Sequence, residues 1–372
     1  MTMTTDKLGL YVHIPYCVRK CNYCDFCSLP NGRCDVPTEY TDALVSEILS
    51  YKDKGIGILD TVYFGGGTPS LLSPSELQKI MDSISTTFRI SHNAEITFEA
   101  NPGTLTRDKA MAFKSCGFNR VSLGLQSIHE KEMKKLGRIH TYQDFLTTFS
   151  LLREVGFANI SVDLMYGIPY QTKESFAESV RALVSLSPEH ISTYGLMVEE
   201  GTPFYNDSKL ELPTLDEECD MYDLGRAILA DAGYEHYEIS NYARAGYRSR
   251  HNSLYWNLGE YIGVGASAHS FLDGKRFFNT DDVDEYTAGK GVALLEDDDV
   301  DLPYEYAMLA LRLREGFSLS EYRERFDKSF TDGKEDVLTR LCAEGLITMT
   351  DGRIALTERV FYLSNSILIE IL

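Results

Sequence analysis

The sequence predicts an α/β protein: an incomplete TIM-like (β/α)6 barrel followed by a small C-terminal helical, winged-helix-like domain. Three observations lead to this prediction. Six apolar runs of strand length recur along the first two thirds of the chain, a helical pattern follows each run, and the pattern changes near residue 241. Strands that alternate with helices form parallel sheets, and right-handed crossovers curl such a sheet towards a barrel. Six units are fewer than the eight that close a TIM barrel.

Apolar runs and capping signals give the expected boundaries of each element. Ser73, followed by Pro74 and Glu76, forms a capping box at the start of one helix. Thr141 and Asp144 form the same pattern at the start of another. The predicted strands are 8–15, 60–66, 95–102, 120–127, 160–169 and 190–197, and the predicted helices are 40–52, 74–88, 107–115, 141–155, 173–186 and 216–232.

We expect three segments along the chain: a barrel at 1–240, a connecting region at 241–295 and a C-terminal domain at 296–372. The last boundary lies beside an acidic run, EDDDVDL (296–302), which is typical of a solvated linker. In the C-terminal domain, Ser318 with Glu321 forms a capping box, and Asp351-Gly352 interrupts an alternating pattern and predicts a hairpin. The lack of basic charge in this domain argues against DNA binding.

Composition and charge indicate a globular protein with a restricted set of partners. The chain of 372 residues is 43% hydrophobic, and its formal charge of −20 disfavours nucleic acid as a partner. The first residues lack the regions of a signal peptide, and no apolar stretch reaches the roughly 18 residues needed to cross a bilayer. We therefore expect a cytoplasmic location. A reducing cytoplasm disfavours disulfides and favours metal or redox roles for clustered cysteines.

Four of the eight cysteines, Cys17, Cys21, Cys24 and Cys27, lie close together in the loop after the first predicted strand. A structural zinc site usually has two separated C-x2-C pairs, and the second pair is missing here. The C-x3-C-x2-C spacing of Cys17, Cys21 and Cys24 instead fits a [4Fe–4S] cluster with one iron left without a protein thiolate. That iron can chelate S-adenosylmethionine (SAM) and pass an electron to its sulfonium. Because Cys27 would close this iron, we do not expect it to be a ligand.

This cysteine motif and its position resemble those of the radical SAM superfamily. The GGGTPS segment (65–70) follows the second predicted strand, where the absence of Cβ atoms lets the backbone approach a ligand. Glu99 and Asp163 each end an apolar strand, although either one read alone could be a solvated rim residue. The resemblance implies SAM contacts at Tyr11, Tyr23, Gly66, Gly67, Thr68, Glu99, Gln126, Arg138 and Asp163.

Further motifs narrow the resemblance to the oxygen-independent coproporphyrinogen III oxidase-like family. They are LYVHIPYC, GGGTPSLL, FEANPGT, GFNRVSLGLQS, VDLMYGIPYQT, STYGLMVEEGTPF, RHNSLYWN and ALRLREG. The dehydrogenase of this family has a fourth cysteine two residues after the third ligand and a long N-terminal arm. Here the fourth cysteine is Cys27, and 16 residues precede Cys17. The resemblance is therefore to the branch of HemW-type haem chaperones, which usually has Asn at the position of Cys27.

A second motif, RHNSLYWN (250–257), supports this branch. Its residues His251, Asn252 and Tyr255 are similar to the haem-binding signature H-N-x-x-Y, and both imidazole and phenolate can bind haem iron. The alternative is that His251 is a packed, hydrogen-bonded structural residue. Basic side chains suited to haem propionates lie beside the motif: Arg244, Arg248 and Arg250.

The resemblance implies a haem chaperone that binds a [4Fe–4S] cluster, SAM and haem. It would deliver haem to an acceptor such as a respiratory enzyme, which can be membrane-associated, and would need an electron donor. The alternative is coproporphyrinogen III dehydrogenase, which forms protoporphyrinogen IX by oxidative decarboxylation, so the sequence leaves open whether the protein is an enzyme. Radical modification of RNA or another metabolite is opposed by the charge. GVGASA (263–268) follows no long apolar strand, and no Rossmann site is expected.

Overall fold

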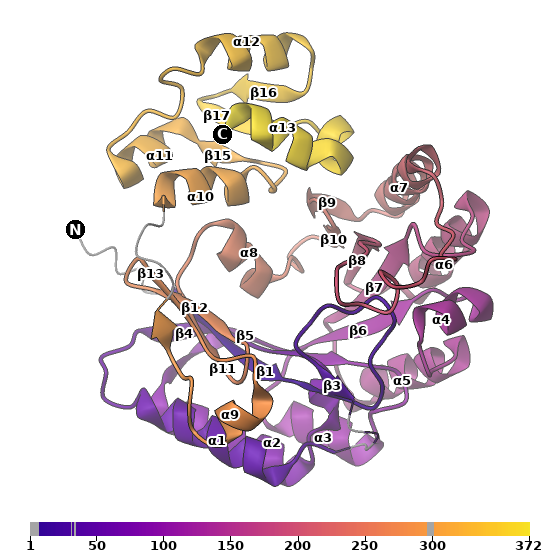
Figure 1. Ribbon diagram of the computed structural model, residues 1–372, viewed down its shortest axis with the longest axis vertical. Coiled ribbons are helices and arrows are strands. Elements are labelled where there is room, and N and C mark those ends of the chain that lie inside the picture. Colours follow the sequence, from indigo (N-terminus) through magenta and orange to yellow (C-terminus); the bar gives the residue numbers. More distant parts are fainter. Residues whose placement is uncertain (1–6, 31, 33–34, 296–300) are drawn as a thin grey trace.

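The computed structural model describes residues 7–30, 32, 35–295 and 301–372, and it confirms the predicted fold class (Figure 1). Across these ranges the main sheet has 12 strands in the order β14-β13-β12-β11-β1-β4-β5-β6-β7-β8-β10-β9. Neighbouring strands from β11 to β8 are parallel. The six predicted strands form the middle of this sheet: β1(Lys7–Ile14), β4(Ile58–Gly66), β5(Arg89–Ala100), β6(Arg120–Gln126), β7(Ile160–Tyr166) and β8(His190–Gly195).

The helices that follow these strands lie on the outer face of the curved sheet (Figure 1). All six predicted helices are present: α1(Thr38–Ser50), α2(Pro74–Thr87), α3(Arg107–Ser115), α5(Tyr142–Val155), α6(Lys173–Leu186) and α7(Leu215–Asp231). The capping boxes at Ser73 and Thr141 are both confirmed. A short helix, α4(Glu130–Leu136), was not predicted because its seven residues are too few to show a helical period.

Residues 235–295 add strands to the sheet that the sequence did not predict. β11(Tyr261–Val264) extends the parallel sheet beside β1, and further strands pair antiparallel at both edges. These additions are β9(Glu235–Glu238), β10(Asn241–Ala243), β12(His269–Leu272), β13(Lys275–Phe278) and β14(Leu294–Leu295), with helix α9(Val283–Thr287). Strands of two to four residues carry too few side chains to be recognised by alternation alone.

Helix α8(Arg250–Trp256) lies between the sheet and the C-terminal elements (Figure 1). It packs against the first half of β1, where a Cβ on Gly9 would lie 2.6 Å from Leu254 Cδ2. Glu95 of β5 accepts hydrogen bonds from the backbone N–H groups of Arg250 and His251. The helix therefore fills the end of the barrel where the strands begin.

The C-terminal part is a small helical unit with a hairpin, as predicted, and β15 adds a third strand that the sequence did not predict. Its elements are α10(Leu302–Ala310), β15(Phe317–Ser318), α11(Leu319–Phe326), α12(Glu335–Ala343), β16(Ile347–Thr350), β17(Arg353–Leu356), η2(Glu358–Leu363) and α13(Ser364–Ile371). Asp351 and Gly352 form the hairpin turn with positive φ angles of 52° and 72°. Ser318 accepts a hydrogen bond from the Glu321 N–H, which is one half of the predicted capping box.

Some sequence expectations lie outside the described residues, namely those on the first six residues and on most of the acidic run (296–300). Among the helices that the structure does describe, none combines the length and the apolar character that a membrane crossing requires.

Candidate functional site: a cysteine-lined cavity

A cavity of about 560 Å³ lies where the parallel strands end, which is the position of active sites in barrels of this kind. Residues of five successive parallel strands, β4 to β8, contribute to its wall, because parallel strands bring their carboxyl ends to one side. Eleven of the residues that the sequence predicted for the cluster and SAM line it: Cys17, Cys21, Tyr23, Cys24, Gly66, Gly67, Thr68, Glu99, Gln126, Arg138 and Asp163.

The cysteine loop, residues 15–30, folds back on itself above β1. A two-stranded pairing of β2(Tyr16–Cys17) with β3(Leu29–Pro30) closes its base. Thr68 Oγ1 donates a hydrogen bond to Cys17 Sγ over 3.3 Å, and Arg138 Nη1 donates one to Cys21 Sγ over 3.5 Å. Donors that point at sulfur stabilise thiolates and the sulfurs of a cluster. In the thiol form, burial raises the pKa of Cys17 and Cys24.

The cysteines fit an iron–sulfur cluster better than a single metal ion. Across the described part of the chain, no three Cys, His, Asp or Glu side chains are placed to hold one metal ion. Cys17, Cys21 and Cys24 instead surround one side of a cavity whose remaining wall carries other polar groups. Three thiols around an open volume are what a cluster with one free iron requires.

Cys27 lies apart from these three thiols. Its Sγ donates a hydrogen bond to the carbonyl oxygen of Asp281 over 3.5 Å, and the residue is absent from the cavity wall. Its own carbonyl oxygen contacts His13 Nε2 at 2.9 Å. The Cys27 side chain therefore points away from the cavity, although its neighbours Phe26 and Ser28 line it.

The glycine segment that follows β4 lies directly under the cysteine loop. Gly66 has a φ of 107°, and a Cβ there would come within 2.6 Å of the His13 ring. A Cβ on Gly67 would lie 2.7 Å from the Tyr16 carbonyl oxygen. A side chain at Gly66 would displace the His13 ring of β1, and one at Gly67 would push the cysteine loop away, so glycine is required for the close approach of these segments. Thr68, which is buried, then reaches Cys17.

Two carboxylates form the acidic part of the wall. Burial raises the pKa of Glu99 to about 7, although Tyr63 opposes the shift by donating a hydrogen bond to Glu99 Oε1 over 2.8 Å. Burial also raises the pKa of Asp163, against the hydroxyls of Ser192 and Ser122. Carboxylates held at the edge of a cavity can accept hydrogen bonds from ligand hydroxyl or ammonium groups.

Arg138 and Gln126 form the basic and amide part of the wall. Arg138 Nη2 donates hydrogen bonds to Asn101 Oδ1 at 2.6 Å and to the Gly124 carbonyl oxygen at 2.8 Å. Gln126 ends β6 with a φ of 74°, a left-handed conformation that non-glycine residues adopt rarely. Asn101 also lines the cavity and bonds Thr68, yet the sequence analysis gave it no role. Its place in the FEANPGT motif, directly after a strand end, was the available signal.

Tyr11 is the one predicted SAM contact that does not line this cavity. Its hydroxyl lies 3.0 Å from His13 Nδ1, and its ring stacks near that of Tyr63 with centroids 6.3 Å apart. Tyr11 thus lies behind the wall, against His13 and Tyr63, which in turn contact the wall residues Gly66 and Glu99. Tyr23, by contrast, lies in the wall, where burial raises its pKa.

The proposed haem ligand His251 is sealed inside the barrel. Its Nδ1 lies 2.8 Å from Thr61 Oγ1, its Nε2 lies 2.7 Å from the Tyr255 hydroxyl, and its ring stacks on Tyr63 with centroids 5.0 Å apart. Burial, assisted by the positive charge of Arg120, lowers the pKa of His251 to about 3. In this conformation both ring nitrogens have partners and neither faces a cavity. The structure therefore agrees with the alternative reading of His251 as a buried, hydrogen-bonded residue.

Tyr255 is the residue of the H-N-x-x-Y motif that faces an open volume. It lines a second cavity of about 240 Å³ between α8, the edge strands and α10, together with Leu258, Gly259, Tyr261, Phe271, Arg276 and Leu309. Arg276 pairs with both carboxylate oxygens of Glu305 at 3.1 Å, which ties β13 to α10 beside this cavity. Asn252 lies on α8 and donates its backbone N–H to Ser249 Oγ over 3.4 Å.

The arginines beside the motif do not form a free basic surface for haem propionates, because their guanidinium groups already have partners within the protein. Arg248 pairs with Glu235 and Glu315, and Arg250 pairs with Asp60. Arg244 donates a hydrogen bond to the Pro188 carbonyl oxygen over 3.4 Å. Side chains distant in the sequence supply these partners, so the sequence analysis missed them.

The GVGASA loop does not form a phosphate-binding turn. The N–H groups of Gly265 and Ala266 donate to Glu47 Oε2 at 2.9 Å and to the Tyr40 hydroxyl at 3.0 Å. The Ser267 N–H donates to the Thr280 carbonyl oxygen. Backbone donors that are already used cannot cradle a phosphate, in agreement with the expectation of no Rossmann site.

Comparisons with known proteins extend over nearly the whole chain. A family model described as "Radical SAM superfamily" matches residues 11–183, and one described as "HemN C-terminal domain" matches residues 298–363. The protein "Heme chaperone HemW" of Bacillus subtilis is 37% identical over 96% of this chain and 97% of its own length. The Escherichia coli protein of the same name is 36% identical, with 97% of each chain covered.

One solved structure shares the fold of nearly the whole chain. It is coproporphyrinogen III oxidase (HemN) from Escherichia coli, a radical SAM enzyme, with a TM-score of 0.86. The match covers 98% of this chain and 90% of that one at 23% sequence identity. At this identity the likeness concerns the arrangement of the barrel and the C-terminal unit.

Proposed function

The chain belongs to the HemW family within the radical SAM superfamily, and from this membership we propose that it is a haem chaperone. In this proposal it holds a [4Fe–4S] cluster and SAM in the first cavity, binds haem as cargo, and delivers haem to an acceptor protein. The observation that carries the proposal is identity of 34–37% to proteins named haem chaperone over nearly the full length of both chains.

We assign the cluster to Cys17, Cys21 and Cys24, with Cys27 outside the ligand set. A bound cluster would supply one-electron reduction and an open iron for SAM. The protein would stabilise it through the hydrogen bonds that Thr68 and Arg138 donate to sulfur. The same guanidinium offsets the negative charge that thiolates bring into a partly buried site.

We assign SAM to the remaining wall of the first cavity. Glu99 and Asp163 would accept hydrogen bonds from its hydroxyl or ammonium groups, and the backbone of Gly66 and Gly67 would lie against it. The remaining contacts of this proposal are Tyr23, Thr68, Gln126 and Arg138, with Tyr11 acting from behind the wall through His13.

We place haem at the second cavity, with the Tyr255 hydroxyl as the group closest to iron. This assignment is supported by the presence of Tyr255 in the cavity lining and by the apolar walls; Arg276 would suit a propionate once its ion pair with Glu305 opens. His251 would accept a hydrogen bond from the Tyr255 hydroxyl at Nε2 and so orient it. Asn252 keeps the role in the motif that the resemblance implies. The volume of 240 Å³ is below the roughly 300–1,000 Å³ of ligand sites, so α10 must move outward to admit haem.

An anaerobic haem titration, read by Soret absorbance, tests the cargo proposal. We expect saturable, stoichiometric binding by the wild type and at least about tenfold weaker binding by Tyr255→Phe and by His251→Ala. Tyr237→Phe is a matched control, because Ser161, His190 and Tyr237 repeat the hydroxyl–imidazole–phenol contacts of Thr61, His251 and Tyr255 away from the cavity. Equal losses in Tyr237→Phe and Tyr255→Phe would show a general effect of barrel damage.

The second candidate is coproporphyrinogen III dehydrogenase, and one observation favours it. Phe26, Ile139 and Met197 line the mouth of the first cavity and are 58–70% exposed. An apolar rim of this kind suits a tetrapyrrole held above SAM, and equally a partner protein. If the wild type binds haem weakly and without saturation but forms protoporphyrinogen IX from coproporphyrinogen III, this candidate replaces the chaperone.

Partners and location belong to the same proposal. Delivery requires a haem acceptor, and reduction of a cluster requires an electron donor; the exposed rim is where we expect one of them to dock. We retain the cytoplasm as the location, because the thiols that would bind an iron–sulfur cluster need a reducing compartment.

A further inference from the structure

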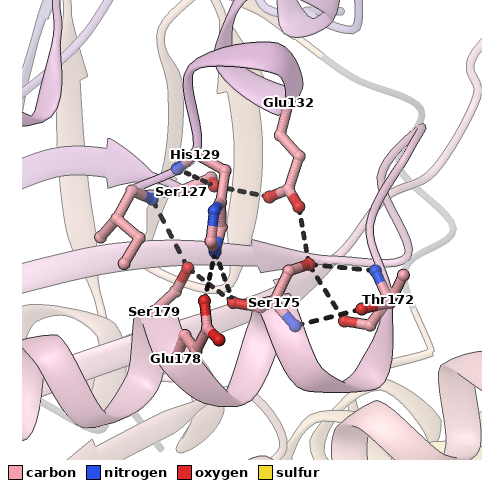
Figure 2. Close-up of polar contacts among 8 residues, drawn as sticks. Ser127, His129, Glu132, Thr172, Ser175, Glu178 and Ser179 are labelled. Carbon is pink, nitrogen blue, oxygen red and sulfur yellow. Dashed lines mark hydrogen bonds and ion pairs between the residues drawn. The ribbon is translucent and has the colours of Figure 1, made fainter.

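A buried carboxylate ties helix α4 to helix α6 on the outer side of the barrel (Figure 2). Glu132, on α4, is 2% exposed. Its two carboxylate oxygens accept hydrogen bonds from different elements, Ser127 Oγ at 2.5 Å after β6 and Ser175 Oγ at 2.7 Å in the first turn of α6. One side chain therefore holds three segments together.

Neighbouring groups reinforce this junction. His129 Nε2 lies 3.0 Å from the Ser175 carbonyl oxygen and 3.5 Å from Glu178 Oε2, and the His129 N–H donates to Ser127 Oγ (Figure 2). The Ile128 N–H donates to Ser179 Oγ over 3.5 Å. The start of α4 is thus fixed to α6 by several contacts, although it has no side-chain cap of its own.

The other end of α4 carries the cysteine loop. Asn22, which lies between Cys21 and Tyr23, donates its backbone N–H to the Leu136 carbonyl oxygen at 2.9 Å and its side-chain N–H to the Lys135 carbonyl oxygen at 2.8 Å. Both acceptors belong to the last turn of α4, whose carbonyl groups lack partners within the helix. The chain then turns at Gly137, where a Cβ would lie 3.1 Å from the Asn22 side chain.

Arg138 follows directly and is fixed by the same helix. Its N–H donates to the Met133 carbonyl oxygen over 3.0 Å, and its guanidinium reaches Cys21 and Asn101 in the cavity wall. A shift of α4 would therefore move Asn22 and Arg138 together, and with them the loop between the second and third proposed cluster ligands, Cys21 and Cys24.

We propose that Glu132 is a positioning residue for the cluster site: through α4 it fixes the cysteine loop and Arg138 relative to the barrel. This inference rests on the proposed cluster and SAM site and adds a residue to it that touches neither. A carboxylate suits the role because its two oxygens accept hydrogen bonds from two hydroxyls, those of Ser127 and Ser175. A movement of α4 away from either serine would break a charge-assisted hydrogen bond. An apolar residue of the same size would hold the helix without fixing its rotation.

The test compares Glu132→Ala with the wild type after anaerobic cluster reconstitution. The readouts are iron and sulfide per chain, the change that SAM causes in the EPR spectrum of the reduced cluster, the dissociation constant of SAM, and the thermal midpoint of the cluster-free protein. Glu189→Gln is the control: its carboxylate pairs with Arg153 and accepts the Ile160 N–H where β7 begins, at the end of the strands away from the cysteine loop.

We expect Glu132→Ala to keep about half or less of the wild-type cluster content and to bind SAM about tenfold more weakly, since small misplacements have large effects on aligned sites. Glu132→Gln, which keeps one acceptor oxygen, should recover part of both. Glu189→Gln should lower the thermal midpoint without changing the EPR response. Wild-type cluster content and SAM affinity in Glu132→Ala would overturn the inference and leave the proposed function intact.

A second variant covers the case in which Glu132→Ala does not fold. Ser175→Ala removes one arm of the junction and, with it, the hydrogen bond that Ser175 Oγ accepts from the Thr172 N–H in the capping box of α6. A normal SAM response in that variant would also overturn the inference. Failure of the wild type to take up any cluster would overturn the proposed cofactor site and this inference with it.

Discussion

Replacing Glu99 by Gln should stabilise the cofactor-free protein at alkaline pH. In the folded state burial raises the pKa of this carboxyl from 4.5 to about 7. A carboxyl with a raised pKa binds its proton more tightly in the folded than in the unfolded protein. Stability is therefore lost as the pH rises from the unfolded to the folded pKa, and the loss is complete above the folded pKa. Gln has no charge to bury and can still accept the Tyr63 hydrogen bond.

The size of the effect follows from the shift. A rise of about 2.5 units corresponds to about 3 kcal/mol at pH 8, because one unit is about 1.4 kcal/mol. Water in the cavity reduces this penalty, so we expect Glu99→Gln to gain about 1–3 kcal/mol at pH 8. At pH 5 most of the wild-type carboxyl is protonated in the folded state, and the expected gain is less than about 1 kcal/mol.

Urea unfolding at pH 5 and pH 8 measures both gains in the cofactor-free protein. The chain contains one Trp, and it is Trp256 on α8, so its fluorescence reports on the barrel. SAM affinity of the reconstituted protein, measured by calorimetry, should fall in the same variant. A gain of equal size at both pH values, or a loss of stability at pH 8, would refute the reasoning, because only a titrating carboxylate produces the pH dependence.

Three further outcomes follow from the geometry of the two cavities. Arg138→Lys keeps the positive charge, but a lysine cannot reach Cys21, Asn101 and Gly124 together. The dissociation constant of SAM should therefore rise about tenfold or more. An unchanged constant would contradict the role of the guanidinium. Cys27→Ser should keep the full iron content of the reconstituted protein, since its thiol points at Asp281, and a loss of iron would make Cys27 a ligand. Glu305→Gln weakens the ion pair that ties α10 to β13. The rate of haem association, measured by stopped flow, should become severalfold faster. An unchanged rate would show that α10 does not control the entry of haem.

Local signals in the sequence were sufficient for most of the barrel. Ser73 with Glu76 and Thr141 with Asp144 satisfy their own backbone groups within one turn, so they mark helix starts whatever the rest of the chain does. Long apolar runs likewise predict strands from local sequence alone. Short elements such as α4 and β11 escaped prediction because their stability comes from neighbours rather than from their own periodicity.

The same difference between local and long-range features applies to the candidate site. The spacing of Cys17, Cys21 and Cys24 and the glycines at 66 and 67 are local features, and the structure places all five around one cavity. Asn101 and Tyr63 were missed, since each acts through a partner in another segment, Thr68 and Glu99 respectively. The free basic patch was wrong for the same reason: Glu235, Glu315 and Asp60 reach its arginines from distant segments.

By itself the sequence determined the class of fold, the order of its units and the chemistry that the cysteine loop can support, because backbone capping, apolar periodicity and ligand spacing act over a few residues. Only the tertiary structure decided which groups face a cavity. His251 and Tyr255 are one helical turn apart, yet packing of α8 into the barrel encloses the first between Thr61 and Tyr63 and directs the second to the seam with α10. Burial and partner choice depend on contacts between segments far apart in the chain, which no local pattern contains.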